Sequence, residues 1–137
     1  KNFHLKKMPN IPKPEGNGIQ PSRDAEDCFS DGMENIYLNN KLALELFQEG
    51  LKFDPDHIGC NFKVGLIHWY GHKDRAEGVK YFEKATTEVL ACKLLGEWYK
   101  NPDYYSMAAE LGDIESKIWL MNYYHQDCSE QRFRCLI

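Results

Sequence analysis

The chain has 137 residues, of which 42% are hydrophobic and 28% are charged, with a net charge of −4. This composition predicts one globular domain that is large enough for a real core. No apolar run approaches the roughly 18 to 20 residues needed to cross a bilayer, which excludes a membrane span. The first 14 residues carry four lysines and no acidic residue, so the rest of the chain has a net charge of −8.

Residues 1–21 are predicted to form an extended tail. Proline removes a backbone donor and disfavours helix in the residue before it, and this segment contains four prolines: Pro9, Pro12, Pro14 and Pro21. Its lysines are compatible with a solvated terminus or with an interaction arm that lies on a partner. We expect the arm. Because the chain begins at Lys1 rather than Met, we also expect a trimmed or mature product.

Two helices are predicted before residue 56. Ser22 is a candidate N-cap for a short helix that ends near residue 37. The second helix shows apolar residues at helical spacing. Asn40 is expected to cap it, and Pro55 prevents its continuation.

Five further helices are predicted, over about residues 56–70, from Asp74 onward, over 88–100, from Asn101 to Gly112 and over 113–125. Pro102 suits the first helical position, and Gly112 suits a left-handed helix end. Gly71 is expected to end the first of the five. No pattern with a period of two survives, so the fold class is all-α. The predicted core is Leu46, Phe47, Val64, Ile67, Phe82, Ala85, Leu95, Tyr99, Tyr105, Ala108 and Leu120.

Two short sequence motifs alternate along the chain. One comprises "LELFQEGL", "VKYFEKAT" and "DYYSMAAE", and the other comprises "VGLIH", "LGEWY" and "LMNYY". This alternation predicts stacked antiparallel helix pairs. Small residues are expected where two backbones approach closely, namely at Gly65, Ala85, Gly96 and Ala108.

These motifs resemble the Sel-1-like repeat family, a branch of the tetratricopeptide-like helical repeats. The best unit spans residues 64–86, with Val64 and Gly65 at the Leu-Gly position and Asp74 as the loop acid. His68 departs from the tyrosine of the family pattern. The resemblance implies a short α-solenoid of stacked antiparallel helix pairs over residues 22–137, with clear repeats over about 40–125, after the extended tail.

Candidate metal ligands are few. His68 and His72 are four residues apart, but Gly71 is expected to break the helix between them. His125, Cys128 and Cys135 form a three-ligand set without a recognisable fourth, and a polar segment after the last helix is the simpler interpretation. No nucleophile elbow, P-loop or dinucleotide motif is present. We therefore expect neither an enzyme nor a metal or cofactor site.

The five cysteines leave two interpretations open. Cys28, Cys60 and Cys92 are spaced by 32 residues. In a secreted chain such cysteines raise the question of disulfides. Here the regular spacing favours one small buried position in each repeat, with reduced thiols. We therefore expect an intracellular protein, cytoplasmic or organellar, with mitochondria among the candidate compartments.

The predicted function is a non-enzymatic scaffold or adaptor within a larger assembly. It would bind another protein or a peptide segment through its tail and a concave groove. The groove residues, counted in phase from the Leu-Gly positions, are Phe62, Lys63, Leu66, Trp69, Tyr70, Lys93, Glu97, Lys100, Trp119, Asn122 and His125. The alternative is an RNA-associated subunit that uses the basic tail and exposed aromatic residues.

Overall fold

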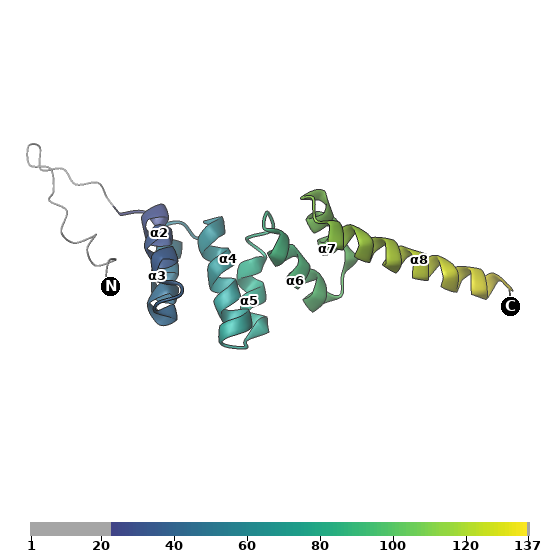
Figure 1. The fold of residues 1–137 in the computed structure, drawn as a ribbon, viewed down its shortest axis with the longest axis horizontal. Helices are drawn as coiled ribbons and strands as arrows, with labels where there is room; N and C mark the ends of the chain where they lie inside the picture. Colours follow the sequence, from purple (N-terminus) through teal and green to yellow (C-terminus); the bar gives the residue numbers. More distant parts are fainter. Residues whose placement is uncertain (1–22, 137) are drawn as a thin grey trace, which may run out of the picture. The chain divides into compact units, whose positions relative to one another are not determined.

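The computed structural model describes the backbone of residues 23–136 and the side chains of residues 23–126 (Figure 1). Every regular element in this part of the chain is helical, which confirms the all-α prediction. The elements are α2 (Ala25–Asn35), α3 (Asn40–Phe53), α4 (Ile58–Leu66), the π-helix η1 (Ile67–Gly71), α5 (Arg75–Phe82), α6 (Val89–Tyr99), α7 (Pro102–Glu110) and α8 (Ile114–Leu136). None of these helices is long and apolar enough to cross a membrane.

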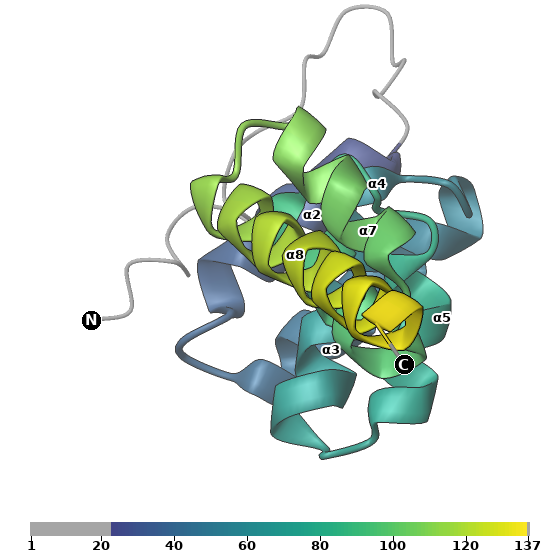
Figure 2. The same ribbon diagram turned by 90° about the vertical axis from the view of Figure 1, so that its right-hand side faces the viewer.

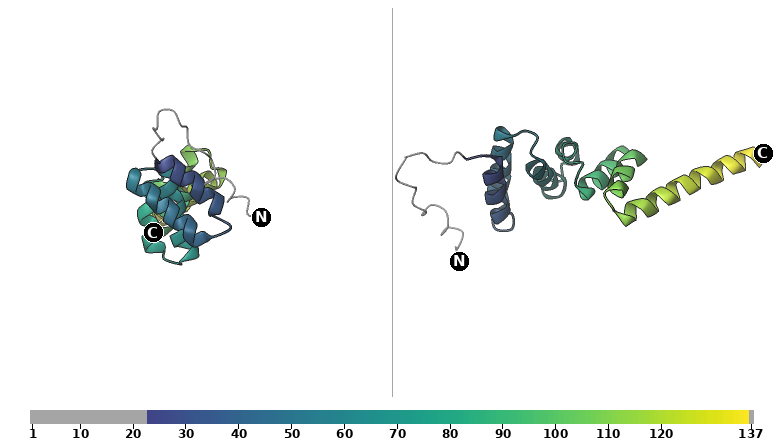
Figure 3. Two further views of the ribbon diagram at one scale, coloured as in Figure 1. Left: turned by 90° about the vertical axis from the view of Figure 1, so that its left-hand side faces the viewer. Right: turned by 90° about the horizontal axis from the view of Figure 1, so that it is seen from above.

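The chain divides into two compact units between Cys60 and Asn61. In the first unit α2 and α3 lie side by side (Figure 3). In the second, α5 contacts η1 and α6, α6 contacts α7, and α7 contacts α8. Figure 2 shows α7 beside the long helix α8. Each of these helices therefore packs mainly on its neighbour in the sequence.

Most helices begin at a side-chain cap. The predicted caps Asp74 and Asn101 are confirmed, because their side chains accept the backbone N–H groups of Glu77 and Asp103. The N-cap of α3 is Asn39 rather than Asn40, since the Asn39 side chain accepts the Leu42 N–H at 3.1 Å. The N-cap of α2 is Asp24, in a capping box with Asp27; the predicted cap Ser22 lies outside the described residues.

Helix ends follow the predicted stop signals except at the last helix. Gly71 ends η1, and Gly112 adopts a left-handed φ of +101° after α7. The sequence predicts that the last helix ends near residue 125, but α8 continues to Leu136. No glycine or proline occurs after Gly112, so no local signal stops this helix.

The helix pairs share a contact in which a glycine of the first helix lies against an aromatic ring of the second. It recurs at Gly32 with Phe47, at Gly65 with Phe82 and at Gly96 with Tyr105. A Cβ atom added at any of these glycines would lie only 2.5 to 2.6 Å from the ring. Two of the small residues predicted at close approaches, Gly65 and Gly96, are therefore confirmed in that role.

The predicted core is largely confirmed. Seven of its members are buried, namely Phe47, Val64, Ile67, Phe82, Ala85, Leu95 and Ala108. Leu46, Tyr105 and Leu120 are half-buried. The prediction for Tyr99 is wrong, because its side chain is 45% exposed. Tyr99 lies at the end of α6, where its ring stacks on Tyr104 and its hydroxyl donates a hydrogen bond to the Glu83 carboxylate.

Cys28, Cys60 and Cys92 are fully buried with free thiols, as predicted from their spacing. Desolvation by burial raises the pKa of each thiol, and the pKa of Cys60 reaches about 12. These cysteines are therefore protonated at neutral pH and act as small core residues.

Candidate protein-binding surface

Trp69 was predicted to line the groove, but it is buried: only 3% of its side chain is exposed. Its ring packs near Phe82 and Trp98, at centroid distances of 5.8 and 6.2 Å, and Arg75 covers it at 4.7 Å. The repeat phase predicts an exposed Trp69. In the structure Trp69 lies four residues after Gly65 and shares its helix face, and Gly78 of α5 packs against both residues.

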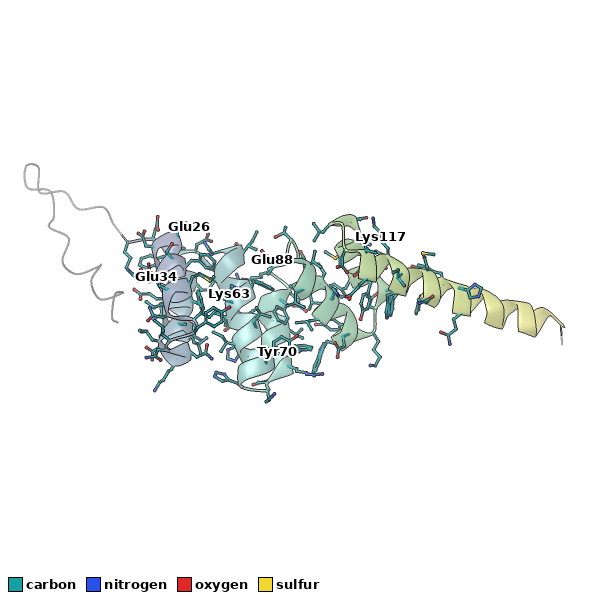
Figure 4. The ribbon with its side chains drawn as sticks, in the orientation of Figure 1. Glu26, Glu34, Lys63, Tyr70, Glu88 and Lys117 are labelled. Carbon is teal, nitrogen blue, oxygen red and sulfur yellow. The ribbon has the colours of Figure 1, made fainter. Side chains whose placement is uncertain are left out.

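Other predicted residues from the same segment have separate surroundings. Phe62 and Leu66 are also corrected, because they are partly buried against the core around Phe82. Lys63 is half-buried, with its Nζ atom 5.5 Å from the Phe62 ring centroid, whereas Tyr70 is 52% exposed (Figure 4). Of this part of the groove, Tyr70 alone presents a large open aromatic surface.

The predicted charges on α6 lie at the surface in ion pairs. The Lys93 ammonium bridges the Asp113 carboxylate, at 3.6 Å, and the Glu115 carboxylate. Glu97 pairs with Arg75 at 3.7 Å. Lys93 therefore joins α6 to the beginning of α8, and Glu97 joins α6 to α5. Lys100 is exposed in a left-handed conformation just after α6.

Three aromatic rings from α7 and α8 form a stack, named here the aromatic column. The Tyr105 and Trp119 rings are 3.8 Å apart and 16° from parallel. The Trp119 and Tyr123 rings are 5.2 Å apart and 11° from parallel. Tyr105 also lies against Gly96, so a helix backbone supports the column.

The column lies next to the α6 charges. Burial raises the pKa of Tyr105, with a further increase from Glu97 and an opposing effect from Lys93, so both charges act on this phenol. The structure thus brings together Lys93, Glu97 and Trp119 from the predicted groove, and adds Tyr105 and Tyr123. These five residues form the candidate surface.

Tyr105 and Tyr123 were missed as binding residues, although the sequence contains a signal for one of them. Trp119 and Tyr123 are four residues apart and therefore share a helix face. Tyr105 was assigned to the core from its phase, and its packing on Trp119 is a tertiary contact. The predicted Asn122 and His125 are exposed on α8.

His68 and His72 lie next to each other, although Gly71 was expected to break the helix between them. The Nδ1 atoms of His68 and His72 lie 3.3 Å apart, and the His68 ring stacks on Tyr81. Among residues 23–126, whose side chains are described, no group of three or more metal-ligating side chains comes together. The Cys128 and Cys135 side chains lie outside that range, so their set with His125 is untested.

Lowering the pH is expected to destabilise the second unit through His68. Burial, followed by His72, lowers the pKa of His68 below 6.5. The unfolded chain therefore binds this proton more readily, and stability is lost as the pH falls below about 6.5. Urea unfolding of the wild type and of His68→Gln at pH 7.5 and 5.5 measures the effect. A smaller pH dependence is expected in the variant, with His125→Gln as an exposed control. An unchanged dependence would contradict the assignment.

The sequence matches no protein-family model, and no curated protein or solved structure shows a significant similarity to it.

Proposed function

We propose that this chain is a non-enzymatic protein-interaction adaptor and that the candidate surface contacts another protein. The aromatic column is the observation that carries the proposal. Tyrosine and tryptophan are the residues most enriched at energetically important positions of protein interfaces, together with arginine. Here three such rings are already stacked before any partner binds, so little side-chain entropy remains to be lost.

The residues around the column indicate which kind of partner side chain would bind there. Tyr123 is the exposed member of the column, at 42%, and offers an apolar ring to a partner, whereas Lys93 and Glu97 at the edge of the column are held in ion pairs within the chain. A partner segment with an apolar or aromatic side chain for the column and polar groups for the rim satisfies both features. The lack of a catalytic motif in the sequence supports a binding role rather than an enzymatic one.

The recurring glycine–aromatic contact supports the Sel-1-like, solenoid interpretation of the fold. Three helix pairs repeat one packing device, which is typical of arrays that present binding surfaces along their length. In this proposal the tail, residues 1–21, adds a second contact with the same assembly. The larger assembly and an intracellular compartment belong to the proposal as well.

The charge distribution favours a protein over RNA. Residues 23–60 contain nine acidic and three basic residues, which would repel phosphate groups. The RNA-associated alternative therefore depends on the basic tail, which lies outside the described residues.

Substitution of the column is expected to remove partner binding. Full-length chain, Trp119→Ala and Tyr123→Ala would be used as bait in extract, and captured proteins quantified by mass spectrometry and then tested again in purified form. We expect both variants to weaken binding roughly tenfold or more, the cost of losing a central aromatic contact. Tyr37→Ala serves as control, since Tyr37 is 95% exposed in the connection between α2 and α3. Equal capture by all baits, with unchanged circular dichroism, would refute the assignment.

A second experiment separates the two candidate functions. Binding of a fluorescent single-stranded RNA of about 20 nucleotides would be titrated against salt, with the full chain and with residues 1–21 removed. Under the adaptor proposal neither protein binds RNA at physiological salt. Tight binding that requires the tail and weakens steeply with salt would favour the RNA alternative.

A further inference from the structure

Two histidines meet at the end of η1, where the chain turns towards α5. The His72 N–H donates to the Ile67 carbonyl oxygen at 2.9 Å. The Asp74 N–H donates to the His68 carbonyl oxygen at 2.8 Å. Between these two bonds, Lys73 takes a left-handed φ of 58°. The chain therefore folds back directly after His72, which holds this residue beside the end of η1.

The rings of these two histidines converge at their Nδ1 atoms. The Nδ1 atoms of His68 and His72 lie 3.3 Å apart, whereas the ring centroids lie 5.1 Å apart and the ring planes are 69° from parallel. The His68 ring is also fixed in place, because it stacks on Tyr81 at a centroid distance of 5.6 Å and an angle of 17°. The two nitrogens are thus arranged as ligands of one central atom would be.

The separations match those of two imidazole ligands on a tetrahedral zinc ion. With Zn–N bonds of about 2.0 to 2.1 Å, two ligating nitrogens of a tetrahedral site lie about 3.3 to 3.4 Å apart. When both rings point at the ion, the same geometry places their centroids about 5.2 Å apart. The observed separations of 3.3 Å and 5.1 Å agree with both values, so little movement is needed to bind an ion.

The surroundings of the pair favour a bound cation. Burial and His72 lower the pKa of His68, which keeps its ring neutral at pH 7, the form that binds a metal; Glu77 and Asp74 oppose this shift. These two carboxylates place negative charge near the rings. Both are engaged within the chain, because Asp74 accepts the Glu77 N–H and Glu77 accepts the Lys80 ammonium, each at 3.1 Å. They therefore contribute charge rather than ligands.

We propose that His68 and His72 bind one zinc ion through their Nδ1 atoms. Imidazole nitrogen is a preferred ligand of this ion. His72 is exposed and His68 is half-buried, so solvent reaches the pair and supplies water for the other two positions of the tetrahedron. In the ion-free chain one Nδ1–H donates to the other Nδ1 atom. The bound ion replaces this hydrogen bond, and both rings then carry their proton at Nε2.

Titration of Zn²⁺ into the reduced full chain, followed by NMR of the imidazole rings of its five histidines, tests the proposal. We expect the His68 and His72 signals to shift together and to saturate at one ion per chain. The His57 signals are expected to stay unchanged, because its two ring nitrogens are engaged with the Cys60 N–H and the Glu26 carboxylate.

Variants separate this pair from other candidate ligands. His68→Gln and His72→Gln each remove one of the two ligands and are expected to weaken Zn²⁺ binding about tenfold or more. His125→Gln is the matched control, since His125 is an exposed histidine of α8, and its affinity for Zn²⁺ is expected to equal that of the wild type. All titrations are repeated with Cys128→Ser and Cys135→Ser, which removes binding by these thiols.

Three results would overturn the proposal. The first is the absence of any shift of the His68 and His72 signals up to about 1 mM Zn²⁺. The second is equal binding by the wild type and the folded glutamine variants, which would mean an adventitious ion only. The third is a shift confined to other histidines, or a loss of binding in His125→Gln alone. Because His72 is exposed, His72→Gln keeps the test decisive if His68→Gln does not fold.

Discussion

Replacement of Phe82 by alanine is expected to lower the free energy of unfolding of the second unit by about 3 to 5 kcal/mol. Phe82 is fully buried, and its ring lies close to Phe62 and Trp69, at centroid distances of 6.3 and 5.8 Å. The ring also covers Gly65, whose position has no side chain to fill the space. Removal therefore leaves a cavity bounded by helix backbone, which cannot collapse without moving α4.

Urea unfolding followed by circular dichroism measures this loss, with Phe53→Ala as the control. Phe53 is 52% exposed at the end of α3, so its removal is expected to cost less than about 1 kcal/mol. A cost this small at Phe82 would mean that the glycine–aromatic contact does not hold the helix pair together.

The second large effect is a loss of stability in Gly78→Ala. The sign of the change shows whether α4 and α5 approach closely at this residue. In an exposed helix this change would stabilise the protein by about 1 kcal/mol. At Gly78, however, the new Cβ would lie 2.9 Å from the Gly65 carbonyl oxygen and 3.3 Å from the Trp69 Cβ. Backbone atoms cannot rotate away as a flexible side chain can, so α5 must move off α4. We expect a net loss of about 2 kcal/mol, since overpacking a core costs roughly 1 to 3 kcal/mol.

The same unfolding experiment tests this prediction against Ala76→Gly, an exposed position of the same helix. The control is expected to lose about 1 kcal/mol through helix propensity alone. If Gly78→Ala were more stable than the wild type, the close approach of α4 and α5 would be wrong.

Most of the local structure was predictable from the sequence. Asp74 and Asn101 cap helices because their side-chain oxygens satisfy backbone N–H groups only a few residues away, and Gly112 ends a helix because it accepts a left-handed conformation. The buried positions of Phe47, Phe82 and Leu95 follow from helical periodicity, which depends on residue order alone. Contacts within one turn are encoded locally, and so they can be read from one short stretch.

The binding surface depended on contacts that no short stretch specifies. Trp69 is buried because Gly78 of α5 packs against the face that Trp69 shares with Gly65, which is a contact between separate helices. The Tyr105–Trp119 stack joins residues of two helices, and its geometry is set by how closely α7 approaches α8. Helical periodicity determines which residues share a face, but the neighbouring helix decides which face is buried. For this protein the sequence alone determined the helices and much of the core, and only the tertiary structure decided where its aromatic residues meet.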